Sequence, residues 1–318
     1  MTATPSRPGA SRGRIRLLVA LAAAFNLLAS LWMRAQVPHW LPVPASAAAP
    51  HVDGLFALET AIGTFLFLGC VEVILWTVLF HRANKYDLDN GAPIEGNTPL
   101  EIVWTLIPLV VVMAIAWHTT RVDGILATLG GKERVSGAEQ ALQVAASQSD
   151  GASRVLAGAG PIQVIARQWS WEFVYANGVR SAELHLPVDQ PAQFELISLD
   201  VLHGFFIPAF RLKQDIIPGS VIRYQLTPTR IGRYRLRDSM FSGGYFATNQ
   251  SDVVVQSEGD FRRWLQDAAR QPLAPSWNAA QDSYRRRLER GDRGWAVVPP
   301  APPPMVNVGL DPKASHEA

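Results

Sequence analysis

The long runs of apolar residues in this chain all lie before residue 122. Residues 55–80 and 102–120 form two such runs. Each is long enough to cross a bilayer as a helix, which takes about 20 residues. After residue 161 the pattern changes to short alternations of apolar and polar positions, typical of strands in a water-soluble fold. The pattern therefore predicts a membrane part followed by a soluble part.

A shorter apolar run, residues 17–33, lies close to the N-terminus. Four arginines precede it, and a segment rich in proline and alanine, residues 42–50, follows it. A basic start, a short apolar centre and small residues beyond it are typical of a secretory signal peptide. The same run is also just long enough to be an uncleaved anchor. Residues 1–50 are therefore predicted to be a signal peptide or an N-terminal anchor, ending in a Pro/Ala-rich spacer.

The loop after the first spanning run begins with His81, Arg82 and Lys85. Basic residues next to helix ends mark the cytoplasmic side of a membrane. Residues 51–122 are thus predicted to form a transmembrane helix hairpin with its tip in the cytoplasm. The C-terminal domain is then predicted on the outer side, periplasmic or lumenal, and the lipid bilayer is one partner of the chain.

Glu72 lies inside the first spanning run. An ionisable side chain at membrane depth is costly, so it is expected to face a protein partner, water or a counter-ion. Two interpretations stay open: a residue of a proton path, or a glutamate hydrogen-bonded to a neighbouring subunit. Either one predicts that the hairpin has a partner within the membrane.

Charge and cysteine content exclude several classes of function. The net charge of +2 is close to balance, and no basic face with interleaved aromatic residues suggests nucleic-acid binding. The single cysteine, Cys70, excludes an intrachain disulfide and a thiolate cluster within one chain. Because it lies in an apolar run, it is predicted to be a small buried hydrophobic residue.

The soluble part divides into three segments. Residues 123–160 are rich in Gly, Ala and Ser and are predicted to be a flexible linker. Residues 161–272 contain short strands separated by turn signals, which predicts an antiparallel sandwich or barrel with a closing helix over residues 258–270. Residues 273–318 are rich in Pro, Ala and Arg and are predicted to be mostly a disordered tail.

Several separate motifs carry a family resemblance. They are EGNTPLEIVWTLIP at 95–108, VIARQWSWEFVY at 164–175, the long segment 184–219, and TPTRIGRYR at 227–235. In content and order they resemble subunit II of haem-copper terminal oxidases, over roughly residues 52–265, with an N-terminal arrangement like that of the cyanobacterial branch. The resemblance implies a membrane-anchored all-β protein: a two-helix hairpin docked on subunit I, then a cupredoxin-like Greek-key β-sandwich.

In family members that oxidise cytochrome c, the sandwich holds the binuclear copper centre CuA. Its ligands are a histidine after a strand and a later loop with the pattern C-x-E-x-C-x-x-x-H-x-x-M. His203 matches the first histidine. The matching loop positions are Asp238, Met240, Ser242, Phe246 and Asn249. Because soft thiolate ligands favour copper and none is present here, we expect these to be vestigial CuA positions, with no metal or cofactor bound by this chain.

The resemblance also points to Glu101 and to the pair Trp169 and Trp171. Glu101 matches the family's acid at the mouth of a proton channel into subunit I, although alone it also suits a helix N-terminus stabilised by the dipole. Trp169 and Trp171 match an aromatic pair near the point where cytochrome c delivers electrons. Without CuA that role disappears, so packing of the sandwich is the expected role.

These expectations lead to a non-catalytic subunit II of a proton-translocating terminal oxidase. The complex is predicted to oxidise a membrane quinol and reduce oxygen, with the haems and CuB in partner subunit I and with subunit III as a further partner. Such a protein resembles quinol oxidases and cyanobacterial alternate respiratory terminal oxidases. Two alternatives stay open: a cytochrome c oxidase type subunit II that accepts electrons by an unrecognised route, and a cupredoxin-like scaffold of another membrane complex.

Overall fold

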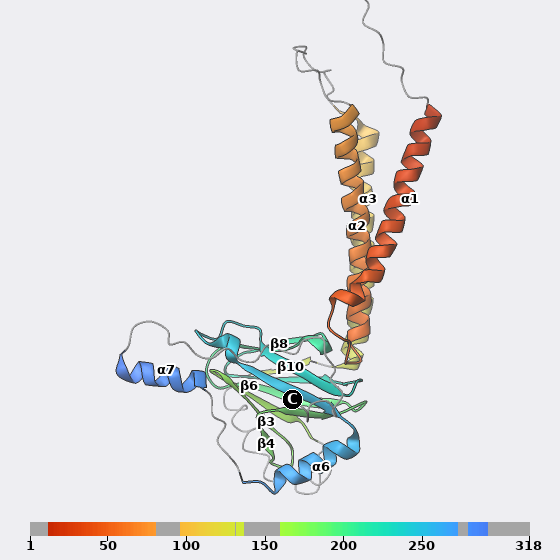
Figure 1. Ribbon diagram of the computed structural model, residues 1–318. Coiled ribbons are helices and arrows are strands. Elements are labelled where there is room, and N and C mark those ends of the chain that lie inside the picture. Colours follow the sequence, from red (N-terminus) through yellow and green to blue (C-terminus); the bar gives the residue numbers. More distant parts are fainter. Residues whose placement is uncertain (1–11, 81–95, 131, 137–159, 273–278, 292–318) are drawn as a thin grey trace, which may run out of the picture. The chain divides into compact units, whose positions relative to one another are not determined.

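The computed structural model describes residues 12–80, 96–130, 132–136, 160–272 and 279–291 (Figure 1). The chain falls into two compact units, Met1–Trp40 with Asp53–Arg121, and Leu41–Val52 with Val122–Ala318. In the described residues the first unit is helical. The second is built mainly of strands.

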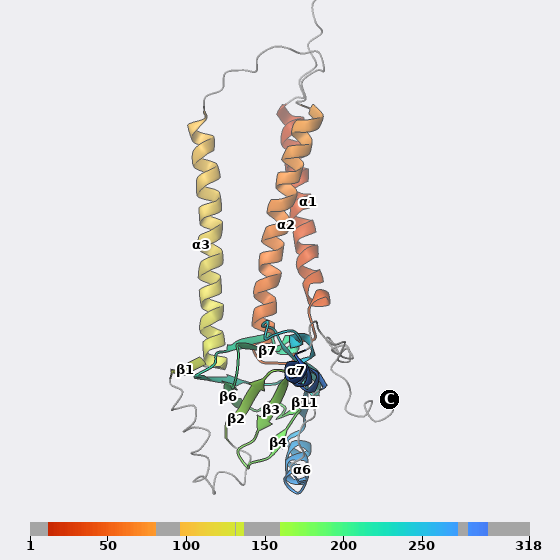
Figure 2. The ribbon, with the colours of Figure 1, turned by 90° about the vertical axis from the view of Figure 1, so that its left-hand side faces the viewer.

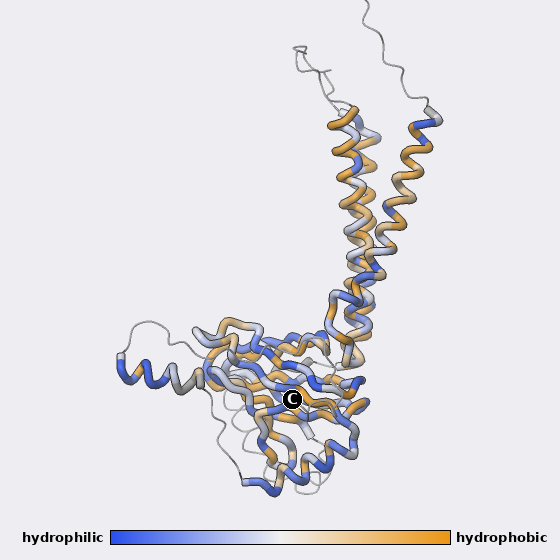
Figure 3. Tube along the Cα trace, in the orientation of Figure 1, coloured by the Kyte–Doolittle hydropathy of each residue, from blue (hydrophilic) through white to orange (hydrophobic). Residues whose placement is uncertain are grey.

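Three long helices carry the apolar runs: α1 (Arg12–Trp40), α2 (Ala49–Phe80) and α3 (Thr98–Leu129). All three are long and apolar enough to cross a membrane. Figure 3 shows apolar residues along the length of each. The two-helix prediction thus differs from the structure, whose described residues contain three candidate spans. The difference arises because residues on both sides of the 17–33 run continue its helix.

The spanning helices expose most of their apolar side chains. Residues 100–110 of α3 are exposed without interruption. Helices that are hydrophobic on all sides are expected in lipid or against other membrane helices. Cys70 also lies exposed on α2, so its prediction as a buried residue within this chain is wrong.

Two sheets form the outer domain. The six-stranded sheet has the order β1-β9-β6-β2-β3-β4. Its strands are β1 (Lys132–Ser136), β9 (Ser220–Leu226), β6 (Ala192–Ser198), β2 (Ile162–Arg167), β3 (Ser170–Val174) and β4 (Arg180–Ser181). The five-stranded sheet has the order β5-β11-β10-β7-β8. Its strands are β5 (Leu184–Pro187), β11 (Gln250–Gln256), β10 (Gly232–Asp238), β7 (His203–Ile207) and β8 (Leu212–Ile216). Neighbouring strands are antiparallel except β2 with β6 and β5 with β11.

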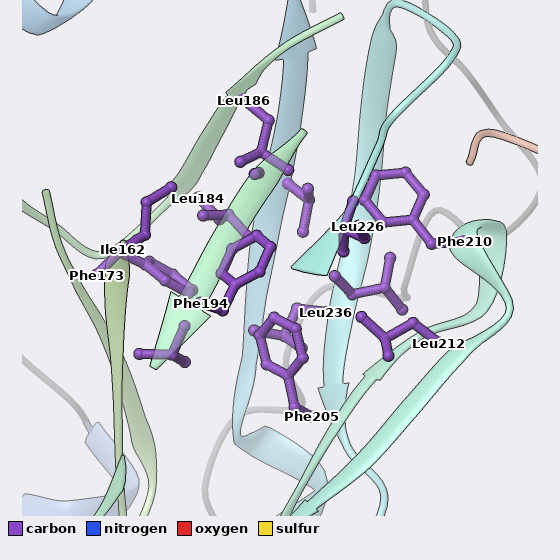
Figure 4. Close-up of a cluster of buried hydrophobic side chains, with 14 of the residues drawn as sticks. Ile162, Phe173, Leu184, Leu186, Phe194, Phe205, Phe210, Leu212, Leu226 and Leu236 are labelled. Carbon is purple, nitrogen blue, oxygen red and sulfur yellow. The ribbon is translucent and has the colours of Figure 1, made fainter. Parts of the chain in front are cut away.

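Alternation along the strands builds the core between the sheets. In β10 the odd and even positions separate cleanly, so that Tyr234, Leu236 and Asp238 are buried while the arginines between them are less so. Phe194 and Phe205 come from opposite sheets and pack with ring centroids 6.0 Å apart (Figure 4). Asp238, at the end of β10, is a carboxylate that the same alternation turns inward.

Two segments predicted as a spacer and a linker take part in the fold. In the Pro/Ala-rich spacer, Ala45 is fully buried and its N–H donates to the Ala209 carbonyl at 2.9 Å. The Ala47 N–H donates to the Thr227 carbonyl at 2.9 Å. The predicted linker contains the end of α3 and strand β1, which pairs with β9. Small residues without bulky apolar neighbours gave no signal of these backbone pairings. Residues 137–159 of the predicted linker lie outside the described residues.

Two further helices follow the last strand. Helix α6 (Glu258–Ala269) begins after Ser257, whose hydroxyl accepts the Asp260 N–H at 3.1 Å. Helix α7 (Ala279–Arg290) lies inside the segment predicted as a disordered tail, so that prediction is wrong for these residues (Figure 1). The segment is rich in arginine, so its composition did not indicate that a few of its residues pack on the sandwich. The remainder of the predicted tail lies outside the described residues.

Candidate functional site

Four of the six candidate copper positions form one buried polar cluster at an end of the five-stranded sheet. His203 begins β7 and Asp238 ends the neighbouring strand β10. Ser242 lies in the loop that follows β10, and Asn249 closes that loop before β11. All four residues are buried, and His203 and Asn249 have no exposed surface at all.

The Asp238 carboxylate is the centre of this cluster. Its Oδ2 lies 2.6 Å from His203 Nδ1. The same oxygen accepts hydrogen bonds from Ser242 Oγ at 2.9 Å and from Asn249 Nδ2 at 3.0 Å. These contacts join both sides of the loop to β7 through one carboxylate.

The second oxygen of Asp238 holds the backbone. Its Oδ1 accepts the Gly204 N–H at 2.7 Å and the Met240 N–H at 3.1 Å. A side chain on residue 204 would clash, because an added Cβ would lie 2.1 Å from Ser239 Oγ. With five hydrogen bonds to its carboxylate, Asp238 fixes the start of the loop that follows β10.

His203 is held from both sides of its ring. Nε2 lies 2.8 Å from Asp200 Oδ1, opposite the contact with Asp238. Burial disfavours the charged ring, but the hydrogen bonds and charges of the two carboxylates outweigh burial and raise the pKa of His203 to about 9. Burial favours the neutral form of both carboxyls as well, yet hydrogen bonds from His203 and from backbone N–H groups lower the pKa of each. At neutral pH the cluster therefore holds one imidazolium and two carboxylates.

These residues do not fit a CuA centre. A copper pair needs bridging thiolates, and the cluster offers a carboxylate and a hydroxyl, Asp238 and Ser242, at the positions expected to match the family's cysteines. A doubly protonated imidazole has no lone pair for a metal, and both nitrogens of His203 face carboxylates. Within the described ranges, no group of three or more His, Cys, Asp and Glu side chains is arranged to hold a metal ion.

The other two candidate positions lie at the margin of the cluster. Met240 contributes its backbone N–H to Asp238. Phe246 begins the short 3-10 helix η3 (Phe246–Thr248) and packs edge to face on Phe241, with ring centroids 5.3 Å apart. The Phe246 side chain has no atom that could bind a metal.

Both candidate tryptophans are buried, in different surroundings. Trp171 lies in the core, where its Nε1 donates to the Asn249 carbonyl at 3.1 Å. Trp169 donates to the Ser242 carbonyl at 3.2 Å. Tyr245 and Tyr284 each meet the Trp169 ring edge to face at 5.2 Å, and Tyr284 comes from α7. Trp169 is only 1% exposed as a result.

Sequence reasoning missed two contributors to this region. Asp200 lies three residues before His203, and that spacing in LDVLH was a signal that could have been weighed. Ala280 and Tyr284 lie four residues apart on α7 and pack on the Trp169 cluster. The surrounding arginines outweighed this short apolar spacing in the sequence.

The two candidate glutamates lie far along the chain from this cluster, in the helical unit. Glu101 is exposed in the first turn of α3, where its Oε1 accepts the Asn97 N–H at 3.1 Å. Asn97 in turn accepts the Leu100 N–H at 3.2 Å, so the two side chains cap the helix start. Glu72 accepts a hydrogen bond from Asn26 Nδ2 of α1 at 3.1 Å.

Comparison with known proteins places the chain in a family. It matches the family models described as cytochrome c oxidase subunit II, transmembrane domain, over residues 34–122, and cytochrome c oxidase subunit II, periplasmic domain, over residues 179–257. Cytochrome c oxidase subunit 2 of Thermostichus vulcanus is 32% identical over 267 residues, which cover 74% of this chain and 81% of the relative. Quinol oxidase subunit 2 of Bacillus subtilis is 27% identical over 230 residues, which cover 70% of this chain and 64% of the relative.

Among solved structures, the periplasmic domain of subunit II of cytochrome oxidase of Bradyrhizobium japonicum is 22% identical to this chain. It covers 34% of this chain and 92% of that domain, with a TM-score of 0.33. The match to a periplasmic domain confirms the outer location predicted for the C-terminal domain. The chain belongs to the cytochrome c oxidase subunit II family and is subunit II of a haem-copper oxidase.

Proposed function

We propose that this subunit II carries no CuA centre and passes no electrons through its own sandwich, and that its complex takes electrons from a membrane quinol. The observation that carries the proposal is the cluster around Asp238. At the positions where the family has its metal ligands, a carboxylate with five hydrogen bonds and an imidazolium occupy the interior. A copper pair would need thiolates where Asp238 and Ser242 lie.

The surroundings of Trp169 support the same proposal. A soluble donor would have to approach an aromatic edge at the surface of the sandwich, as the family resemblance implies. Here the ring is enclosed by Tyr245 and by Tyr284 of α7. Edge-to-face packing of this kind stabilises the fold by about 1 kcal/mol per pair beyond the area it buries, and it leaves no exposed edge for a partner.

Relatives of both electron-donor types are similar to this chain. One is named quinol oxidase subunit 2, at 27% identity, and another cytochrome c oxidase subunit 2, at 32% identity. Identity alone does not separate the two, because the membrane and sandwich scaffold is shared. The chemistry of the six candidate copper positions is what supports the quinol type in this proposal. A cytochrome c oxidase that accepts electrons by another route is the second candidate.

In this proposal the chain itself contributes to assembly of the oxidase complex and to proton uptake by that complex. Subunit I would carry the haems and CuB, and α3 exposes a continuous apolar surface that suits such a membrane partner. We assign to Glu101 the collection of protons at the cytoplasmic side, where an exposed carboxylate can exchange protons with water and pass them to a channel. Subunit III is a further expected partner of the complex.

Metal analysis and oxygen uptake of the purified complex test the proposal. We expect copper only at the level of subunit I's own centre, oxygen uptake with a quinol, and none above background with reduced cytochrome c. Copper in excess of that level, bound to this chain, would contradict the absence of CuA. A sandwich without copper, in a complex that oxidises cytochrome c, would instead favour the second candidate. Oxygen uptake with cytochrome c at low and high salt would then distinguish specific docking from weak electrostatic contact, which salt screens.

A further inference from the structure

Helix α1 has a buried stripe on one face. The residues of this stripe that are less exposed than their neighbours are spaced four and three apart, the spacing of a helix that packs along another helix. They are Ala22, Asn26, Ala29, Ser30, Met33, Gln36 and Val37. Three of these seven, Ala22, Ala29 and Ser30, are small, and small residues let membrane helices approach closely.

A polar pair joins this stripe to α2. Asn26 Nδ2 donates to Glu72 Oε2 at 3.1 Å, and Asn26 is only 4% exposed. Gly69, one turn before Glu72, faces the same amide, since a Cβ added to it would lie 3.9 Å from Asn26 Nδ2. Figure 2 shows α3 apart from α1 and α2, whereas in Figure 1 α1 leans away from α2 toward its N-terminal end.

The two residues also lie at the same depth in the membrane. Asn26 is nine residues beyond the start of the first apolar run, and Glu72 is eight residues before the end of α2 at Phe80. At a rise of about 1.5 Å per residue, both lie roughly 12 to 14 Å from the cytoplasmic edge of a hydrocarbon core about 30 Å thick. No water is available there, so each polar side chain needs the other.

The segment after α1 gives a second, independent observation. Its small residues around Ala45 and Ala47 are the feature that suggested a signal peptidase site. In the fold this segment is bound to the sandwich, and the Ser46 hydroxyl donates to the Phe210 carbonyl at 2.8 Å. The Thr229 N–H donates to the Ala45 carbonyl at 2.9 Å, so backbone groups on both sides of Ser46 are paired.

We propose that α1 is kept as a third transmembrane helix of the mature subunit, fastened to α2 by the hydrogen bond between Asn26 and Glu72. Glu72 is then a structural residue of the helix contact and no member of a proton path. Its partner belongs to this chain. This inference does not depend on the electron donor of the complex.

The first test is the N-terminus of the subunit purified within its complex through a C-terminal tag. Intact mass and N-terminal sequencing should find a chain that still contains α1. A chain that begins within residues 45–50 would overturn the proposal.

A cysteine pair tests the contact itself. Asn26→Cys with Gly69→Cys, in a Cys70→Ser background, should give linked peptides after mild oxidation. The matched control replaces Phe67, which is 67% exposed on another face of α2, with cysteine instead of Gly69 and should give none. Equal cross-linking of the two pairs would contradict a fixed contact between these helices.

Substitutions at the pair separate a structural role from proton transfer. Glu72→Gln keeps an acceptor for the Asn26 amide but cannot titrate, so oxygen uptake and proton release by the complex should stay within twofold of the original protein. Asn26→Leu and Glu72→Leu each leave one polar group unpaired and should lower the yield of assembled complex, whereas the double variant should recover part of it. A coupling of about threefold is the usual size for such bonds in membranes. Loss of proton release in Glu72→Gln, with assembly intact, would refute the structural role.

Discussion

Replacing Asp238 by asparagine should destabilise the outer domain far more than its small change in shape suggests. The side chain keeps its volume, but it loses its charge and one of its two acceptor oxygens. In the original protein Oδ1 accepts two backbone N–H groups and Oδ2 accepts from three side chains. In either orientation of the new amide, its NH2 group faces groups that donated hydrogen bonds to the original carboxylate.

The size of the effect follows from what is left unpaired. The Ser242 hydroxyl can turn and the Asn249 amide can flip, so each can accept a hydrogen bond from the new NH2 group. The imidazolium of His203 cannot do so while it is charged. Losing a charged hydrogen bond partner in a buried site costs about 3 kcal/mol. For a domain of this size that corresponds to a melting temperature lower by roughly 6 to 12 °C.

The pH dependence gives the prediction its sharper form. The pKa of His203 is raised from 6.5 to about 9 in the folded protein, which corresponds to about 3 kcal/mol of stabilisation. Because the folded pKa lies above the unfolded one, this contribution is fully present below about pH 6.5 and is lost as the pH rises through 9. Asp238→Asn removes one of the two carboxylates responsible. The stability difference between the two proteins should therefore be largest near pH 6 and shrink toward pH 9.

Urea unfolding of the full chain in detergent, followed by tryptophan fluorescence, measures this difference. Asp215→Asn is the control, because the Asp215 side chain is 43% exposed and its ion pair with Lys213 is long, at 3.6 Å. That substitution should cost less than about 1 kcal/mol. Equal losses in the two variants, or a loss in Asp238→Asn that is the same at pH 6 and pH 9, would refute the ion cluster described around His203.

Three other predictions concern the rest of the proposal. Glu101→Gln should slow proton uptake by the complex while keeping an acceptor for the helix cap, whereas Glu101→Ala should also loosen the start of α3; normal uptake in the glutamine variant would reduce Glu101 to a cap. A chain that ends at residue 272 lacks α7 and should expose Trp169 to acrylamide quenching, an increase that must disappear when Trp169 is replaced by Phe. Placing the family's ligand types at the five changed loop positions should make the chain bind copper with a visible absorption band; an unchanged copper content would mean that the matched positions are wrong.

The strands were predictable where one face is buried and the other is not. In β11 buried residues alternate with partly exposed ones, and the sequence QSDVVVQ shows part of that period. The spacer around Ala45 and strand β1 gave no such signal. They are ordered by backbone hydrogen bonds to partners more than 80 residues away in the chain, and a single sequence does not encode those partners in a local pattern. Helix α7 was missed for a related reason. Only a few of its residues, such as Ala280 and Tyr284, pack on the sandwich, and the arginines around them dominate its composition.

The site was predictable in its positions more than in its chemistry. The family pattern pointed to His203 and five loop positions, and the structure brings four of these six residues together. It did not predict that Asp238 would bind the ring of His203 or that Asp200 would hold the other nitrogen. Those contacts depend on inward rotamers and on a loop geometry that only the folded chain supplies.

If this chain holds no CuA, as we propose, the loop between β10 and β11 has to be held without a metal. In family members with CuA, covalent ligands join the loop to the strand that carries the first histidine. Here Asp238 makes the same connection through hydrogen bonds to His203, Ser242 and Asn249. Removing the ligands without such a replacement would leave buried polar groups unpaired, each at a cost of about 1 to 3 kcal/mol. If the chain holds no CuA, as we propose, the ion cluster is what joins the loop between β10 and β11 to β7.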